Sequence, residues 1–250
     1  MATGTEEDRV DAETPALGDF NGDGHLDLAT GGRLLYGPFD RTTGAARSRT
    51  LALEAEYFTD DVAAGDVDHD GITDLVALIH DRSDDGMHDP DHKHRREVFL
   101  RGTRDGLSAP APVNNPDGTR MRGGESLGVG DVDKDGYADL VIGRPNDGFG
   151  EVDLDDPLLK GGQIGVVHGS ADGPDTSRTI IMQDSPGVPG ASEWADTFGG
   201  AISVGDVDAD GSRTSPPAAR ARESARCTRP ARSPSCAAAG PGSPGRAPSA

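Results

Sequence analysis

Short apolar runs recur along the chain in pairs, and an acidic, glycine-rich segment separates the two runs of each pair. Runs 62–64 and 75–79 flank one such segment, and runs 127–129 and 140–142 flank another. Short runs rich in valine and isoleucine and bounded by glycine are typical of strands rather than helices. Each pair therefore predicts a β-hairpin whose turn is the acidic segment.

A third apolar run follows each acidic segment at a variable distance. These runs lie at 33–37, 98–106 and 162–173, and candidate fourth strands lie at 50–53 and 179–183. A repeated unit of four consecutive antiparallel strands is typical of a propeller blade. The sequence therefore predicts an all-β fold, a partial β-propeller with three blades and the start of a fourth. The predicted division is an N-terminal extension at 1–14, blades at 15–57, 58–121 and 122–190, the start of blade 4 at 191–211 and a disordered tail at 212–250.

The acidic segments share the pattern Gly-Asp-x-(Asp/Asn)-x-Asp-Gly, which occurs at 18–24, 65–71, 130–136 and 205–211. We number each loop from its first aspartate. Oxygen-bearing side chains then occupy positions 1, 3, 5 and 9, a glycine at position 6 permits a sharp turn, and the position-7 carbonyl can point inward. These are the hard oxygen ligands of calcium, whereas magnesium needs stricter octahedral geometry and zinc prefers nitrogen or sulfur.

The predicted calcium ligands are the side chains at positions 1, 3, 5 and 9 and the backbone carbonyl at position 7. They are Asp19, Asn21, Asp23, His25 and Asp27 in loop 1; Asp66, Asp68, Asp70, Ile72 and Asp74 in loop 2; Asp131, Asp133, Asp135, Tyr137 and Asp139 in loop 3; and Asp206, Asp208 and Asp210 in loop 4. An EF-hand is excluded because its loop ends in a bidentate glutamate at position 12. Here that position holds Thr30, Ala77 and Ile142.

These loops resemble those of the FG-GAP repeat proteins, whose best-known members are the seven-bladed propeller heads of integrin alpha chains. The resemblance covers residues 15–211. At the starts of the repeats the Phe-Gly signature survives only as Phe198-Gly199, and Gly143-Arg144-Pro145 stands where the family has Gly-Ala-Pro. The resemblance implies a calcium-binding module for extracellular recognition or adhesion, not an enzyme, whose partner is an extracellular protein or carbohydrate. Two alternatives stay open: an accessory propeller of a secreted hydrolase, and a disrupted gene product without function.

The charge of the chain narrows the classes of partner. Its formal net charge is −20, and the acidic residues lie almost wholly before residue 212. Such a surface repels nucleic acid and acidic membranes. The chain has no apolar run long enough for a membrane span and no basic, apolar leader at residues 1–8, so we expect no signal peptide in this chain. Because loops of this kind need extracellular calcium concentrations, we expect the intact parent protein to be secreted or displayed on a cell surface.

Residues 212–250 differ from the rest of the chain. They contain no Val, Ile, Leu, Met or aromatic residue. A single shift of reading frame allows 212–218 to encode Pro-Asp-Ile-Ala-Ala-Gly, which restores an aspartate at position 9 of loop 4, and allows 230–245 to encode a third-strand pattern. We therefore interpret the tail as frameshifted and predict that it is disordered. Cys227 and Cys236 lie within it, and we expect neither to be functional.

Three further features suggest chemistry, and a structural interpretation is preferred for each. Gly124-Glu125-Ser126-Leu127-Gly128 matches a nucleophile elbow, but it leads into loop 3 and not into a helix, so we expect Ser126 to be a strand residue. The histidine-rich stretch 81–94, with His88, His92 and His94, could bind zinc or copper, but a solvated loop is favoured. Trp194 is either a surface anchor for a partner or a cap over a blade edge, and the cap is favoured.

Overall fold

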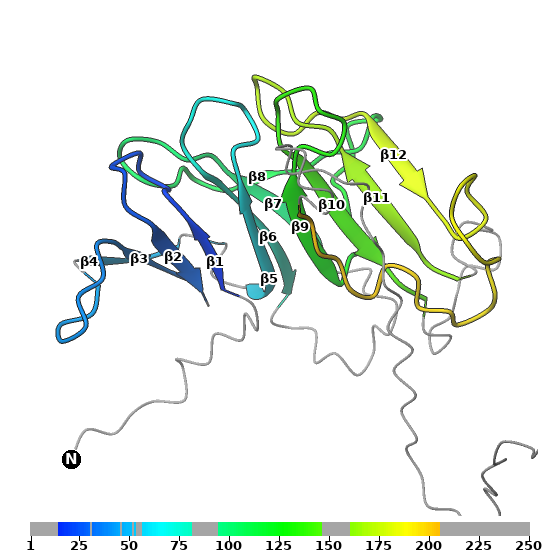
Figure 1. Cartoon of the computed structure of the whole chain (residues 1–250), viewed down its shortest axis with the longest axis horizontal. Coiled ribbons are helices and arrows are strands. Elements are labelled where there is room, and N and C mark those ends of the chain that lie inside the picture. The colour runs from blue at the N-terminus through cyan, green and yellow to red at the C-terminus, as the bar shows by residue number, and fades with distance from the viewer. Residues whose placement is uncertain are drawn as a thin grey trace, which may run out of the picture.

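The computed structural model describes residues 15–30, 32–45, 47–51, 53, 57–81, 95–146 and 161–205. In these residues twelve strands form three four-stranded antiparallel sheets, which stand side by side in chain order (Figure 1). The predicted all-β class is therefore confirmed, with sheets of the kind that form propeller blades. Loop 4 from residue 206, the histidines at 88, 92 and 94, and the tail with its two cysteines lie outside the described residues.

Each sheet is a simple meander in which strands adjacent in sequence pair with each other. The first sheet contains β1 Ala16–Gly18, β2 Asp27–Thr30, β3 Arg33–Tyr36 and β4 Arg47–Thr50; the second contains β5 Tyr57–Gly65, β6 Asp74–Asp81, β7 Arg96–Leu100 and β8 Ala111–Pro112; the third contains β9 Ser126–Gly130, β10 Asp139–Arg144, β11 Gln163–Val167 and β12 Arg178–Ile181. In every sheet the acidic loop joins the first two strands. These turns all lie along the upper edge in Figure 1.

Burial explains which strands were predicted correctly. All five residues of β11 and the first five of β10 are buried, because the faces of these central strands are covered. Strands covered on both faces read as continuous apolar runs. In contrast, β4 is fully exposed. The predicted fourth strand at 50–53 was therefore misplaced, since an exposed strand carries no burial pattern, and the first sheet is completed by Arg47–Thr50.

The hydrophobic cores lie between neighbouring sheets. One core joins residues of the first and second sheets, including Leu34 and Leu75, and another joins the second and third, including Leu78 and Leu140. The position-2 side chains Phe20 of loop 1 and Val67 of loop 2 are fully buried in these cores. Burying a side chain of this size contributes about 1.5 to 3 kcal/mol. Loops 1 and 2 are therefore anchored on the packing between sheets.

The chain that leads towards loop 4 packs against the third sheet. In the described stretch 191–205 no strand forms, but Ile202 and Val204 lie close to Gly128 of β9. The hydroxyl of Ser126 donates a hydrogen bond of 3.0 Å to the carbonyl of Gly199. Ser126 is thus a strand residue of β9, as predicted. Trp194 is 49% exposed.

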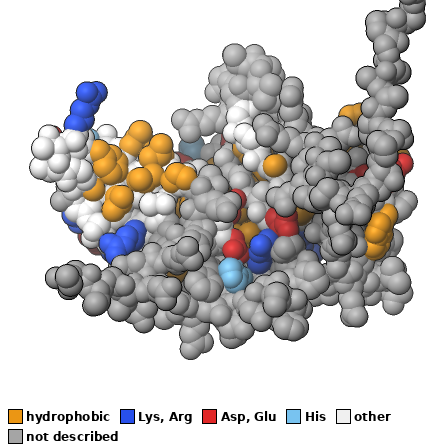
Figure 2. All heavy atoms as spheres, turned by 90° about the horizontal axis from the view of Figure 1, so that it is seen from below, with side chains coloured by type: hydrophobic (Ala, Val, Ile, Leu, Met, Phe, Trp, Pro, Cys, Tyr) orange, Lys and Arg blue, Asp and Glu red, His pale blue; other side chains and the backbone are white. Residues whose placement is uncertain are grey.

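The opposite end of the second sheet carries a charged cluster. Asp60 lies 2.8 Å from Nδ1 of His80 and 3.2 Å from Nε of Arg95. Figure 2, which views the molecule from below, shows charged side chains near the middle of this face and hydrophobic side chains gathered beneath the first sheet. Charged side chains therefore lie at both ends of the sheets: the acidic loops at the upper end in Figure 1 and the Asp60 cluster at the lower end.

A buried ion pair connects the second and third sheets. Nη2 of Arg144 lies 3.5 Å from Oε1 of Glu97, and Nε of Arg144 donates to the carbonyl of Gly123 at 2.9 Å. The Glu97 side chain is fully buried. Arg144 stands where the family pattern has alanine, and the pairing with Glu97 explains this departure. Burial raises the pKa of Glu97 to about 7, against the opposing effect of Arg144.

We expect Glu97 to make the calcium-free protein less stable as the pH rises. Its folded pKa is about 7 and its ordinary value is 4.5, so the folded state binds the extra proton and stability falls as pH passes from about 5 to 8. In chelator, the free energy of unfolding of the wild type should fall by about 2 kcal/mol more over this pH range than that of Glu97→Gln. Urea denaturation at each pH measures the difference. Glu125→Gln, which removes a half-exposed glutamate, should keep the wild-type slope. Equal slopes for wild type and Glu97→Gln would contradict the expectation.

Candidate metal centre

The three described acidic loops share one pattern of hydrogen bonds. In loop 2 the Asp66 carboxylate accepts from the backbone N–H groups of Asp70 at 3.1 Å and Gly71 at 3.0 Å, and Asp70 accepts from Ile72 at 2.8 Å. The corresponding bonds are Asp23 and Gly24 to Asp19 and His25 to Asp23 in loop 1, and Asp135 and Gly136 to Asp131 and Tyr137 to Asp135 in loop 3. The chain therefore curls around its own carboxylates in the same way three times.

This curl requires left-handed backbone at two positions of each loop. The position-6 glycines have φ between 83° and 96°, a region in which glycine carries no steric penalty. Position 4 is left-handed as well, with φ of 65° at Gly22, 59° at His69 and 68° at Lys134. The conserved turn geometry thus accommodates a side chain at position 4.

The position-9 aspartates are fully buried and tie each loop to the third strand of its sheet. Both carboxylate oxygens of Asp74 accept backbone hydrogen bonds, from Val67 at 2.9 Å and from Gly102 at 2.7 Å. Asp27 accepts from Phe20 and Gly37, and Asp139 accepts from Val132 and Gly169, at 2.8 to 3.1 Å. Burial raises the pKa of all three carboxyls, that of Asp74 to about 6. Position 9 therefore has a structural role besides any role as a ligand.

The glycine that follows each third strand is a site residue that the sequence motif did not reveal. A Cβ atom on Gly37, Gly102 or Gly169 would lie 2.2 to 2.4 Å from the backbone carbonyl oxygen at position 8 of the loop. Only glycine allows the N–H to reach the position-9 carboxylate past that carbonyl. The signal in the sequence was the glycine that recurs in every third apolar run, as Gly37, Gly102 and Gly169.

Neighbouring loops are joined by backbone hydrogen bonds. The N–H of Thr73, at position 8 of loop 2, donates to the carbonyl of Asp19 at 3.0 Å, and the N–H of Ala138, at position 8 of loop 3, donates to the carbonyl of Asp66 at 3.1 Å. The rings of His69 and Tyr137 also meet edge to face, 5.8 Å between centroids. Each loop thus packs directly on the loop of the next sheet.

Two loops bring three carboxylates together. In each of these triads the oxygen atoms lie within 4.8 Å of one another: Asp66, Asp68 and Asp70 in loop 2, and Asp131, Asp133 and Asp135 in loop 3. In loop 1 the position-3 residue is Asn21, whose Nδ2 donates to Asp23 at 3.0 Å. The predicted position-3 and position-5 ligands therefore converge with position 1 in loops 2 and 3.

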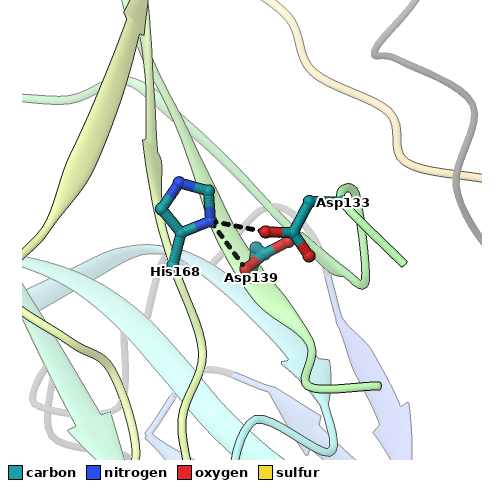
Figure 3. Close-up of side chains that lie close together, drawn as sticks. All are labelled: Asp133, Asp139 and His168. Carbon is teal, nitrogen blue, oxygen red and sulfur yellow. Dashed lines mark ion pairs between the residues drawn. The ribbon is translucent and has the colours of Figure 1, made fainter. Parts of the chain in front are cut away.

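Sequence reasoning missed two basic side chains at the loops. Nδ1 of His168 lies 3.2 Å from Asp133 and 3.4 Å from Asp139, so that this imidazole faces loop 3 (Figure 3). Nη1 of Arg101 lies 2.6 Å from Oδ2 of Asp68 in loop 2. Both residues immediately precede the glycine that follows the third strand. In the sequence, the one feature that these two residues share is their place directly before that glycine.

Comparison with known proteins shows the family. The FG-GAP repeat model matches residues 12–34 and 123–155. This chain is an FG-GAP repeat protein. It is 30% identical to integrin alpha-PS2 of Drosophila melanogaster over 206 residues, 25% identical to integrin alpha-5 of Xenopus laevis over 222 and 29% identical to integrin alpha pat-2 of Caenorhabditis briggsae over 215. These alignments cover 78%, 84% and 78% of this chain but only 14%, 20% and 16% of the integrins.

The donor atoms of this FG-GAP protein fit a hard divalent cation. Carboxylate and amide oxygens are the ligands that calcium prefers. In loop 2 the side chain of Asp68 is 1% exposed, and its Oδ2 lies 2.6 Å from Nη1 of Arg101. Burial raises the pKa of Asp68, against the opposing effect of Arg101. A cation bound between Asp66, Asp68 and Asp70 would be held by carboxylate oxygens that the fold already brings together.

No helix in the described ranges is long and apolar enough to cross a membrane.

Proposed function

We propose that this FG-GAP protein is a calcium-binding propeller module for extracellular recognition or adhesion. The observation that carries the proposal is the threefold repetition of one loop geometry, with two convergent carboxylate triads. The proposed ligands are the position 1, 3, 5 and 9 side chains and the position-7 carbonyls of loops 1 to 3, together with Asp206, Asp208 and Asp210 of loop 4, which lies outside the described residues. Bound calcium would neutralise carboxylates that the fold holds close together.

The proposed role of calcium is structural. Loops 1 and 2 each insert a side chain into a core between two sheets, and each is hydrogen-bonded to the loop of the next sheet. A cation that stiffens these loops would therefore also stiffen the contact between sheets. The described loops therefore connect metal binding to the rigidity of the propeller surface. Such a surface serves a binding function better than catalysis, and the proposed partner is an extracellular protein or carbohydrate. The relation to integrin alpha chains supports a secreted or cell-surface location for the parent protein.

Removing the position-5 carboxylates should abolish calcium binding. Asp70 and Asp135 belong to the triads and Asp23 is their counterpart in loop 1, so the triple variant Asp23→Ala, Asp70→Ala, Asp135→Ala should lose the binding heat of the three loops. Single variants should each lose one site, with wild-type dissociation constants on the order of 10⁻⁴ to 10⁻³ M. Isothermal titration calorimetry measures both. Asp105→Ala removes an exposed aspartate on a turn and should bind as wild type does.

Recognition can be tested separately on arrays of glycans and extracellular matrix proteins. Calcium-loaded wild type should bind at least one class of ligand, and chelator or the triple variant should abolish that binding. Unchanged binding heat in the triple variant would contradict the metal assignment. A folded, calcium-loaded chain that binds neither class would contradict the recognition role.

A further inference from the structure

We infer that Arg101 sets the calcium affinity of loop 2, acting as a built-in cation beside the ligand Asp68. The inference rests on the calcium binding proposed above. Arg101 follows β7 and precedes Gly102, so the close packing of Gly102 under the loop directs the neighbouring side chain towards it. Nη1 of Arg101 lies 2.6 Å from Oδ2 of Asp68. Among the described residues, this guanidinium is the partner of that oxygen.

Among the three described loops, loop 2 is the one that has an arginine, a permanent cation, in this place. The residue before the third-strand glycine is Tyr36 in the first sheet, Arg101 in the second and His168 in the third. Tyr36 is neutral and buried, and the position-3 residue of its loop, Asn21, is neutral too. Where position 3 is an aspartate, a basic side chain faces it. The residue at position 3 and the residue before the third-strand glycine thus change together within one chain.

The consequence for binding follows from electrostatics. Loop 2 has four aspartates and loop 1 has three with an asparagine, so Arg101 brings the net charge of loop 2 to that of loop 1. A calcium ion that enters loop 2 must either displace the guanidinium from Asp68 or accept a positive charge a few ångströms away. Both weaken binding. Because Arg101 is 37% exposed, solvent screens part of the effect, and we expect its removal to tighten loop 2 by about tenfold.

An NMR titration of the full chain can measure each loop separately. The N–H of Gly71 donates to Asp66 and reports on loop 2, while the N–H groups of Gly24 and Gly136 report on loops 1 and 3. With calcium chloride as the probe, Arg101→Gln should lower the dissociation constant seen at Gly71 about tenfold and leave the values at Gly24 and Gly136 unchanged. The gain should shrink in high salt, because screening weakens the repulsion.

Two matched variants test the role of the charge. Arg101→Lys retains a cation and should keep the Gly71 affinity within about threefold of wild type. Arg104→Gln removes an exposed arginine from the next turn and should leave the calcium affinity measured at Gly71 unchanged. Equal or weaker binding at Gly71 in Arg101→Gln, with the spectrum of a folded protein, would overturn the inference alone. A folded wild-type chain in which none of the three glycine amides responds to calcium would overturn the proposed function, and this inference with it.

Discussion

Replacing Asp74 by alanine should destabilise the calcium-free protein by about 3 kcal/mol. The Asp74 carboxylate is fully buried and accepts the N–H groups of Val67 and Gly102, so its removal leaves two buried donors without a partner. Each unsatisfied donor costs about 1 to 3 kcal/mol, partly offset because the buried carboxylate itself is poorly solvated. Urea denaturation in chelator measures the loss.

Asp70→Ala is the matched control in the same loop. Asp70 is exposed, so water can replace its hydrogen bonds, and the free energy of unfolding in chelator should stay within about 1 kcal/mol of wild type. Both variants should lose calcium binding at loop 2. Equal stabilities of the two variants in chelator would show that position 9 has no structural role beyond metal binding.

Replacing Gly169 by alanine should have an effect of similar or larger size. The new Cβ would lie 2.4 Å from the carbonyl oxygen of Ala138 and 2.9 Å from that of Val67, and backbone atoms cannot rotate away as a side chain can. The third strand must then move away from loop 3 and break the hydrogen bond from Gly169 to Asp139. We expect a loss of about 3 kcal/mol or more, measured by urea denaturation.

Gly165→Ala is a stringent control because Gly165 lies on β11, the strand that Gly169 follows. Its Cβ would be 3.7 Å from Cδ1 of Ile180, an ordinary van der Waals distance, and the cost should stay below about 1 kcal/mol. Calcium titration should show loop 3 impaired in Gly169→Ala and intact in Gly165→Ala. A Gly169→Ala protein as stable as Gly165→Ala would contradict the close approach of this strand to the loop.

The strands that the sequence predicted well are those whose burial leaves a pattern. The central strands β6, β10 and β11 are covered by neighbouring strands and sheets, and their apolar runs were legible. The edge strand β4 has no buried residue, and β8 is two exposed residues long, so neither could be located from polarity. The positions of these edge strands are set by backbone hydrogen bonds to the neighbouring strand, and the order of polar and apolar residues does not reveal them.

The acidic loops were predictable because their ligands lie within nine residues of sequence. Their supporting residues were not, because register across the sheet brings them in. The pairing of Leu75 with Leu100 places Gly102 opposite Thr73, and the pairing of Leu140 with Val167 places Gly169 opposite Ala138. Arg101 and His168 reach the loops through the same registers. A single sequence gives the composition of these third strands, but not their alignment on the loops.

The hydrogen bond between position 8 of one loop and position 1 of the preceding loop has an evolutionary consequence. Donor and acceptor are both backbone atoms of the repeated motif, so every unit carries a donor for the preceding loop and an acceptor for the following one. Tandem duplication of one unit supplies a compatible neighbour immediately, with no new interface to be selected. The number of blades in such a protein can therefore change in whole units, while the segment between the second and third strands diverges freely in length.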